Sequence, residues 1–175
     1  MCKRVLTLGC CAAPVLILTL TLSATTIPRL TFEQLTDASD LIASGRVTQS
    51  WGAWDSEHKY IWTHYLLSVS ETARGASAAS VEFAEPGGTV GDASMMIAGS
   101  VVYKVGADVV VFLSRMPNGY LRTTGWAQGK YALDTNGRLH GVAALGGEVT
   151  LDGLSLTELK QRVAVRVRAT SGKLQ

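Results

Sequence analysis

The middle of the chain alternates short apolar runs with clusters of Gly, Pro and Asn, a pattern that is typical of antiparallel β-strands joined by turns. We predict six to eight strands, of which the best defined cover residues 41–50, 60–71, 80–84, 109–114, 120–124, 130–133 and 138–142. The segment 60–71 is the clearest, because Ile61, Tyr65 and Leu67 recur at alternate positions. Its other face is also partly apolar, which predicts that both faces of this strand are covered.

Two short segments at the ends of this β-rich region carry helix start signals. Thr31 and Gln34 form a capping-box pair, and a helix is predicted from Phe32 to about Ala38. Ser155 begins a second capping box, and apolar residues at helical spacing follow it, which predicts a carboxyl-terminal helix over about residues 156–168. The two helices therefore bracket the strands.

Short strands at this spacing need a closed or sandwiched sheet, because their apolar faces and their edges must be covered. We therefore predict a mainly β fold, a small closed or partly open antiparallel β-barrel of the OB type with a short N-terminal helix and a C-terminal helix. About 150 residues is the size of one domain, so residues 25–175 are predicted to form a single β-rich domain.

The amino terminus has the charge pattern of a secretory signal. Lys3 and Arg4 precede a stretch, residues 5–22, that contains no charged residue, and cleavage after Ala24 or Thr25 is the preferred position. Residues 1–24 are thus predicted to be a signal peptide, and the protein is predicted to be exported to the periplasm or the extracellular space. The alternative is an uncleaved membrane anchor through residues 5–22.

This segment also contains all three cysteines, Cys2, Cys10 and Cys11. A mature chain without it forms no disulfide, thiolate nucleophile or cysteine-ligated zinc site. A lipid anchor at Cys10 is disfavoured because the apolar core before it is short. Loss of Lys3 and Arg4 from the 16 basic residues also leaves them equal in number to the 14 acidic ones, so no electrostatic case for nucleic-acid binding remains.

Several segments in fixed order carry a resemblance to known proteins; they are residues 38–47, 61–63, 74–75, 86–88, 106–113 and 125–131. In these the chain resembles a family of uncharacterised secreted bacterial proteins. Its order of elements is also similar to the netrin-like modules of the tissue inhibitors of metalloproteinases, which implies an OB-type barrel and a binding role. Those inhibitors act through an amino-terminal cysteine that the mature chain lacks, so their mechanism is not carried over.

No cofactor or metal is predicted. Asp55, Glu57, His58 and His64 have the composition of a metal site, but an extended segment from His58 to His64 spans about 20 Å, too far for one ion. His64 is instead expected on a sheet surface. The segment 125–130 departs from a phosphate loop in its glycine spacing, and its glycines are expected to bend a strand.

The four tryptophans lie in two segments, and most of them are expected in the core. Trp51 and Trp54 are different, because a polar stretch surrounds them, and a loop rim there is the predicted binding surface. The candidate binding residues are Trp51, Trp54, Asp55, Lys59 and Trp62.

The first functional hypothesis is an exported, non-enzymatic binding module for a protein or glycan partner, with no nucleic acid and no membrane contact unless the N-terminal segment is uncleaved. The alternative is an extracytoplasmic hydrolase with a dispersed catalytic site, since the chain has neither a G-x-S-x-G elbow nor an H-E-x-x-H helix. Such an enzyme would gather His64, His140 or Asp92 in one pocket. A membrane-tethered structural protein is the third hypothesis.

Overall fold

The fold is described by a computed structural model, which defines residues 28–141 and 151–172. The predicted signal peptide, residues 1–24, and residue 142 at the end of a predicted strand lie outside these ranges. In chain order the elements are α1 (Phe32–Asp37), β1 (Leu41–Trp54), β2 (Ile61–Arg74), β3 (Ser80–Pro86), β4 (Gly88–Val90), β5 (Ala93–Met95), β6 (Asp108–Arg115), β7 (Leu121–Thr123), the 3-10 helix η1 (Trp126–Gly129), β8 (Lys130–Leu133), β9 (Leu139–Gly141) and α2 (Leu156–Ser171).

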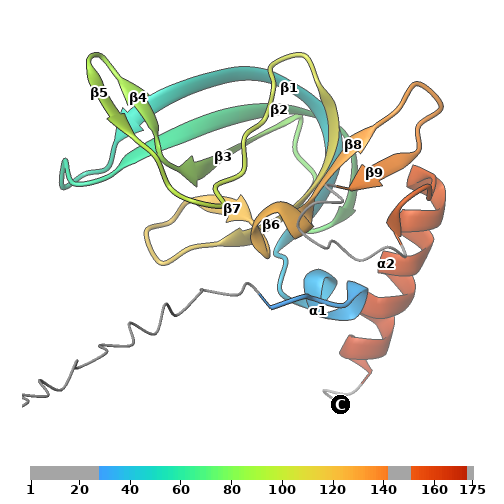
Figure 1. Ribbon diagram of the computed structural model, residues 1–175. Helices are drawn as coiled ribbons and strands as arrows, with labels where there is room; N and C mark the ends of the chain where they lie inside the picture. The colour runs from blue at the N-terminus through green and yellow to red at the C-terminus, as the bar shows by residue number, and fades with distance from the viewer. Residues whose placement is uncertain (1–27, 142–150, 173–175) are drawn as a thin grey trace, which may run out of the picture.

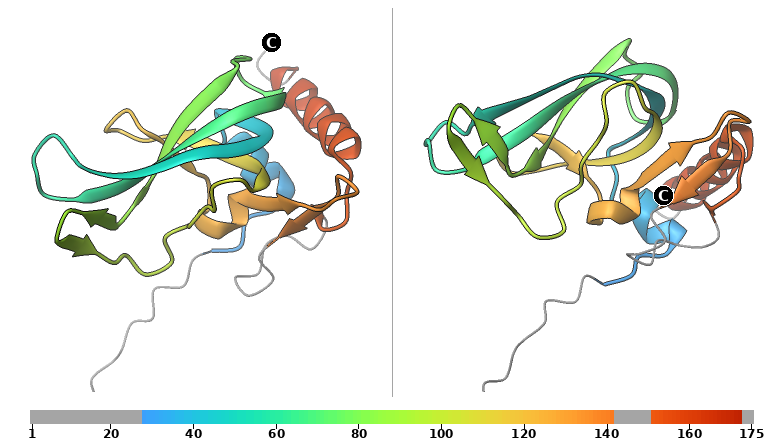
Figure 2. Two further views of the ribbon diagram at one scale, coloured as in Figure 1. Left: turned by 90° about the horizontal axis from the view of Figure 1, so that it is seen from above. Right: turned by 45° about the horizontal axis from the view of Figure 1, so that its top comes forward.

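A curled antiparallel sheet forms most of the molecule, in the order β3-β2-β1-β6-β8-β9, and β7 pairs with the end of β6 (Figure 1). The mainly β, antiparallel prediction with a short N-terminal helix and a C-terminal helix is confirmed. The sheet is not closed, because among the described strands β3 pairs only with β2 and β7 pairs only with β6. Figure 2 shows α1 and α2 on one side of the sheet and the small β4–β5 hairpin at the opposite end.

Two apolar cores cover the two faces of the central strands. Val109, Val111 and Leu113 of β6 point into the curl of the sheet, where they pack with Tyr65 and Phe83, among others. The alternate residues of β6, Val110 and Phe112, pack on the other face against α1, α2 and Tyr131. This double burial explains why the sequence of β6 is an unbroken apolar run instead of an alternating one.

Both predicted capping boxes are present. The Thr31 hydroxyl accepts a hydrogen bond from the backbone N–H of Gln34, and the Gln34 side chain accepts one from the Thr31 N–H at 2.9 Å. Ser155 and Glu158 form the same reciprocal pair at the start of α2, which continues to Ser171, a little beyond the predicted end. Within residues 28–141 and 151–172, no helix has the length and apolar character needed to span a bilayer.

The expectation that most tryptophans lie in the core is wrong. None of the four is buried: Trp51 is exposed, and Trp54, Trp62 and Trp126 are half-buried. The aromatic part of the inner core consists instead of Tyr65, Phe83 and Tyr103, whose ring centroids lie about 5 Å apart. The physical reason is register, because Trp62 falls on the opposite face of β2 from Tyr65.

Two local expectations also differ from the structure. The glycines of this segment do not bend a strand: residues 126–129 form η1, and Gly125, the residue before it, lies in the left-handed region at φ 63°. The Pro-Gly-Gly segment at 86–88, a cluster of the kind expected to join strands by a turn, leads directly into the β4–β5 hairpin, which the sequence pattern did not predict. A Cβ on Gly88 would lie 2.3 Å from the Thr63 hydroxyl, so a glycine is needed for this close approach.

Candidate functional site

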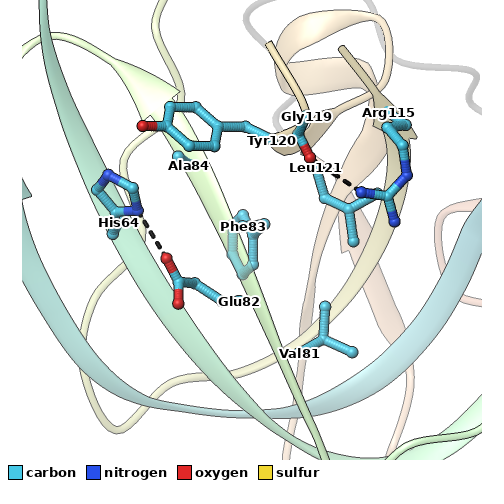
Figure 3. Close-up of a pocket in the computed structure, with 9 residues that line it drawn as sticks. All are labelled: His64, Val81, Glu82, Phe83, Ala84, Arg115, Gly119, Tyr120 and Leu121. Carbon is cyan, nitrogen blue, oxygen red and sulfur yellow. Dashed lines mark hydrogen bonds and ion pairs between the residues drawn. The ribbon is translucent and has the colours of Figure 1, made fainter. Parts of the chain in front are cut away.

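A groove lies between β3 and the hairpin that joins β6 to β7 (Figure 3). Its volume is about 350 Å³, which is within the range of small ligand sites. From β3 and the neighbouring strand β2 it is lined by His64, Val81, Glu82, Phe83 and Ala84. The β6–β7 hairpin contributes Arg115, Gly119, Tyr120 and Leu121.

The β3 side of the groove is an unpaired strand edge. Just after β3, the N–H of Gly87 donates a hydrogen bond to the Ile61 carbonyl at 2.8 Å. In this register, the odd-numbered residues of β3 are the ones that form hydrogen bonds with β2. Because the hydrogen-bonding direction alternates along an antiparallel strand, the backbone groups of Glu82 and Ala84 point away from β2. Of these two residues, Glu82 is exposed at the groove, whereas Ala84 is fully buried.

The β7 side is a second edge of the same kind. The N–H of Met116 donates to the Tyr120 carbonyl at 2.8 Å, so the even-numbered residues of this hairpin bond to each other across it. The backbone groups of Leu121 and Thr123 consequently point away from β6 and toward β3. No backbone hydrogen bond between β3 and β7 is found in the described residues.

At one end of the groove the side chain of Glu85 connects these two edges. Its Oε1 accepts a hydrogen bond from the Thr123 N–H at 2.8 Å, and its Oε2 lies 3.4 Å from Nε of Arg122. Glu85 is 1% exposed, and this burial raises the pKa of its carboxyl group, although the bonds from Thr123 and Arg122 oppose the shift. A side chain thus takes the place of backbone pairing there.

An aromatic cluster lies next to the groove on the outward face of β1 and β2. The Trp51 and His64 rings stack with their centroids 5.4 Å apart, and Tyr120 meets His64 edge-on at 5.2 Å. Trp62 packs against the same Tyr120 ring at 5.3 Å. We call Trp51, Trp62, His64 and Tyr120 the aromatic cluster. It brings residues of β1 and β2 together with Tyr120, the residue just before β7.

His64 is the most buried member of this cluster, and its expected position on an exposed sheet surface is wrong. It is only 6% exposed, because Trp51 and Tyr120 cover it. Its Nδ1 forms a 2.8 Å hydrogen bond with Oε1 of Glu82, as Figure 3 shows. Its Nε2 and the indole nitrogen of Trp62 are both buried and have no hydrogen-bond partner among the described residues. Such atoms are unusual in proteins, where nearly all buried polar groups are hydrogen-bonded.

The five predicted binding residues separate into two groups. Trp51 and Trp62 belong to the aromatic cluster beside the groove. Trp54, Asp55 and Lys59 lie at the tip of the β1–β2 hairpin, where the Lys59 N–H donates to Oδ1 of Asp55 at 2.8 Å. Trp54 there stacks on His58 with a centroid distance of 6.3 Å. The structure thus does not place all five on one contiguous surface around the groove.

Charge around the groove comes from Glu82 and Arg115. Glu82 is bonded to His64. The guanidinium of Arg115 donates to the Gly119 carbonyl at 2.9 Å, and its backbone N–H donates to Asp40. In the part of the chain that the structure describes, this guanidinium forms no ion pair with a carboxylate. Arg115 thus provides a positive charge that a ligand can neutralise.

The titratable residues considered for a hydrolase do not converge. His64 lines the groove, whereas His140 lies in the β8–β9 hairpin, half-exposed and 3.2 Å from Asp134. Asp92 lies in the turn between β4 and β5 and does not line the groove. Among the described residues, no group of three or more His, Cys, Asp or Glu side chains is arranged to hold a metal ion.

The sequence analysis did not identify Glu82, Glu85, Arg115 or Tyr120 as site residues. One signal was available for Glu85, because alternation places it on the same apolar face of its strand as Val81 and Phe83. An acidic residue at such a position is a candidate for a buried, bonded carboxylate. The other three are recognisable only once β3 and the β6–β7 hairpin are brought together.

Comparisons of this chain with known protein families, with curated proteins and with solved structures found no match. The two resemblances noted from the sequence therefore remain predictions.

Proposed function

We propose that this protein is a non-enzymatic binding module that engages a protein partner through the groove and the adjacent aromatic cluster. The observation that carries the proposal is the position of two unpaired strand edges, β3 and β7, beside an exposed tryptophan. Tryptophan, tyrosine and arginine are the side chains that dominate the energetics of protein interfaces, and Trp51, Tyr120 and Arg115 provide all three.

A protein partner is favoured over a glycan by the backbone groups in the groove. Glu82, which is exposed on the outer edge of β3, offers an N–H and a C=O group of the kind that pairs with another polypeptide chain. A glycan would use an aromatic platform without this edge. Trp51 alone provides such a platform, so a glycan partner remains the second possibility for the same surface.

We also propose that the curled strands form a partly open barrel of the OB type. The support is that β3 and β7, the two ends of the path β3-β2-β1-β6-β7, lie close enough for Glu85 to bond Thr123. The amino-terminal charge pattern supports the further proposal that the module acts outside the cytoplasm, in the periplasm or the extracellular space.

Capture of the partner tests this proposal. Tagged protein recovered from its extracytoplasmic fraction is expected to retain a specific protein, and Tyr120→Ala is expected to reduce the retained amount about tenfold or more, as for a hot-spot residue. Tyr120 is only half-buried, so the variant should fold, which circular dichroism checks. Trp54→Ala is the matched control at the hairpin tip and should retain the partner. Retention that is unaffected by Tyr120→Ala but lost in Trp54→Ala would place the interface at the hairpin tip.

One observation favours the alternative of a hydrolase. The Glu82 carboxylate bonds Nδ1 of His64 at 2.8 Å, which is how a carboxylate orients a histidine that acts as general base through Nε2. No Ser, Thr or Cys is among the residues that line the groove, so such a histidine would have to activate water.

Assays with 4-nitrophenyl esters, phosphates and glycosides test this alternative. If it holds, the wild type turns over one of these classes, and Glu82→Gln lowers kcat by about 10²-fold or more, the scale of general base catalysis. Glu85→Gln is unsuitable as a control because Glu85 is buried, whereas Glu71→Gln changes an exposed carboxylate far from the groove. The absence of turnover in all three classes, or an undiminished rate in Glu82→Gln, would argue against a hydrolase.

A further inference from the structure

We propose that a second cleft, between the end of β2 and the last turns of α2, binds a phosphate group through Arg74 and Arg168. This inference goes beyond the proposed function, because the cleft and the groove share no lining residue. The phosphate group can be free phosphate or the phosphomonoester headgroup of a lipid, since both present the same chemistry to the two arginines.

The cleft lies where the end of β2 and the last turns of α2 run side by side (Figure 2). Its volume is about 480 Å³, larger than that of the groove. The end of β2 and the loop after it contribute Thr72, Arg74 and Ser77, and α2 contributes Arg168. The other residues that line the cleft are small or apolar, and among the described residues of the lining none is acidic.

Both guanidinium groups at the cleft are without a carboxylate partner. Within residues 28–141 and 151–172, neither Arg74 nor Arg168 forms an ion pair or a hydrogen bond through its side chain. Three other arginines each pair with a carboxylate; they are Arg46, Arg122 and Arg166. Because like charges repel, two arginines that line one cleft are stabilised by an anion bound between them.

The acidic side chains near the cleft already have basic partners. Asp37 bonds Arg166, which lowers the pKa of the Asp37 carboxyl group, and the charge of Arg74 lowers it further. Glu71, the residue before Thr72, pairs with Lys160 at 2.7 Å. Each of these carboxylates is thus balanced by one cation, and the charges of Arg74 and Arg168 are in excess.

The end of α2 does not account for the position of Arg168. A basic residue in the last turn of a helix often bonds the free carbonyl groups there. In α2 the Thr170 hydroxyl donates to the Arg166 carbonyl at 3.1 Å. The Ser171 hydroxyl donates to the Val167 carbonyl at 3.0 Å. The negative end of a helix dipole is equivalent to about half a charge, so two full positive charges outweigh it at the cleft.

A phosphate group fits these donors better than a carboxylate does. One guanidinium donates two parallel N–H bonds to a pair of oxygens, so a single arginine satisfies a carboxylate. A phosphomonoester has three free oxygens and close to two negative charges at neutral pH, and it can engage two arginines at once. The hydroxyl groups of Thr72 and Ser77 provide further donors at the same cleft.

Titration with inorganic phosphate tests this inference on the full mature chain. In NMR spectra recorded at constant ionic strength, the Nε–H signals of Arg74 and Arg168 should shift together and saturate, with a Kd on the order of 1 mM. Arg74→Gln and Arg168→Gln should each weaken binding about tenfold, the effect of losing one charge-assisted contact. Arg168 is exposed, so its variant should fold, which circular dichroism checks. Arg46→Gln is the matched control, because it removes the same charge away from the cleft and should bind phosphate like the wild type.

Acetate provides the test of the chemical class. At equal ionic strength it should bind about tenfold more weakly than phosphate, because one arginine satisfies it. Equal binding of acetate and phosphate, shifts that do not saturate, or phosphate binding that both arginine variants leave unchanged would overturn the inference.

Vesicles of phosphatidylcholine, with and without phosphatidic acid, separate the two sources of the phosphate group. Sedimentation of the protein only with phosphatidic acid, and its loss in Arg168→Gln, would support a lipid headgroup. Saturable phosphate binding without such sedimentation would support a free phosphate. Capture of a protein partner through Tyr120 does not depend on either result, so the proposed function and this inference fail separately.

Discussion

Replacement of Glu85 with alanine is expected to lower the free energy of unfolding by about 3–5 kcal/mol, the cost of removing one partner from a buried charged pair. The variant leaves the Thr123 N–H without its acceptor and Arg122 without its carboxylate. Arg122 is itself mostly buried, lying 3.8 Å from the centroid of the Trp126 ring, so water replaces the lost contact poorly. Urea unfolding monitored by tryptophan fluorescence measures the change.

The matched control is Glu71→Ala. Glu71 also pairs with a basic residue, Lys160, at 2.7 Å, but both side chains are close to half-exposed. Its removal should therefore cost no more than about 1 kcal/mol. If the Glu85 and Glu71 variants lost similar free energies, the carboxylate between β3 and β7 would have no special structural role.

The pH dependence of the free energy of unfolding provides a second test of the Glu85 carboxylate. Burial raises the pKa of Glu85 above the ordinary value of 4.5, so the folded state holds this proton more tightly than the unfolded state. The contribution of this proton to the free energy of unfolding is therefore fully present below pH 4.5, and it is lost as the pH rises through the raised pKa. The titratable groups near the Glu85 carboxyl are Arg122, Lys130 and Tyr103. The Lys130 ammonium lies 4.7 Å from the centroid of the Tyr103 ring.

Glu85→Gln isolates this effect, because glutamine does not titrate. The difference in unfolding free energy between the wild type and Glu85→Gln should move in favour of the wild type as the pH is lowered from 8 toward about 4. Titrations common to both proteins, such as those of Asp37 and Asp134, cancel in the difference. A difference that stayed constant over this range would mean that the pKa of Glu85 is the same in both states.

The elements that the sequence predicted well are those specified by neighbouring residues. The capping boxes at Thr31 and Ser155 each lie within four consecutive residues, and both helices begin where these predict. The long strand β2 was recognised because apolar residues recur at alternate positions over much of its length, and a few exceptions do not hide this pattern. By contrast, β4 and β5 are only three residues long each, and glycines surround them. Such segments have no periodicity to detect.

The groove was not predictable by the same means, because its two sides come from distant parts of the chain. Glu85 and Thr123, which close its end, are 38 residues apart. Tyr120 was expected only as part of a hairpin strand, and its contact with His64 depends on how the sheet curls. Trp51 and Trp62 were identified as binding candidates from composition, and they do lie beside the groove. Whether they bind a partner remains a prediction.

Truncation of Phe112 to alanine should separate the helical layer from the sheet. Phe112 is fully buried on the face of β6 that packs against α1 and α2, and its ring centroid lies 6.0 Å from that of Tyr131. Removal of a buried phenylalanine ring costs about 3–5 kcal/mol, because a cavity remains where the surroundings cannot collapse. Urea unfolding should show this loss.

The positions at which hydrogen exchange quickens in this variant show whether the two apolar cores unfold separately or together. In Phe112→Ala, hydrogen exchange should quicken most in α2, whose Leu159 and Val163 share this core, and less in β2 and β3, which pack around Tyr65 on the other face. Val102→Ala, at a residue that is 72% exposed, is the control and should stay within about 0.5 kcal/mol of the wild type. Equal acceleration in α2 and β3 would mean that the two cores unfold as one cooperative unit. In that case α2 would be an integral part of the sheet domain and could not detach alone.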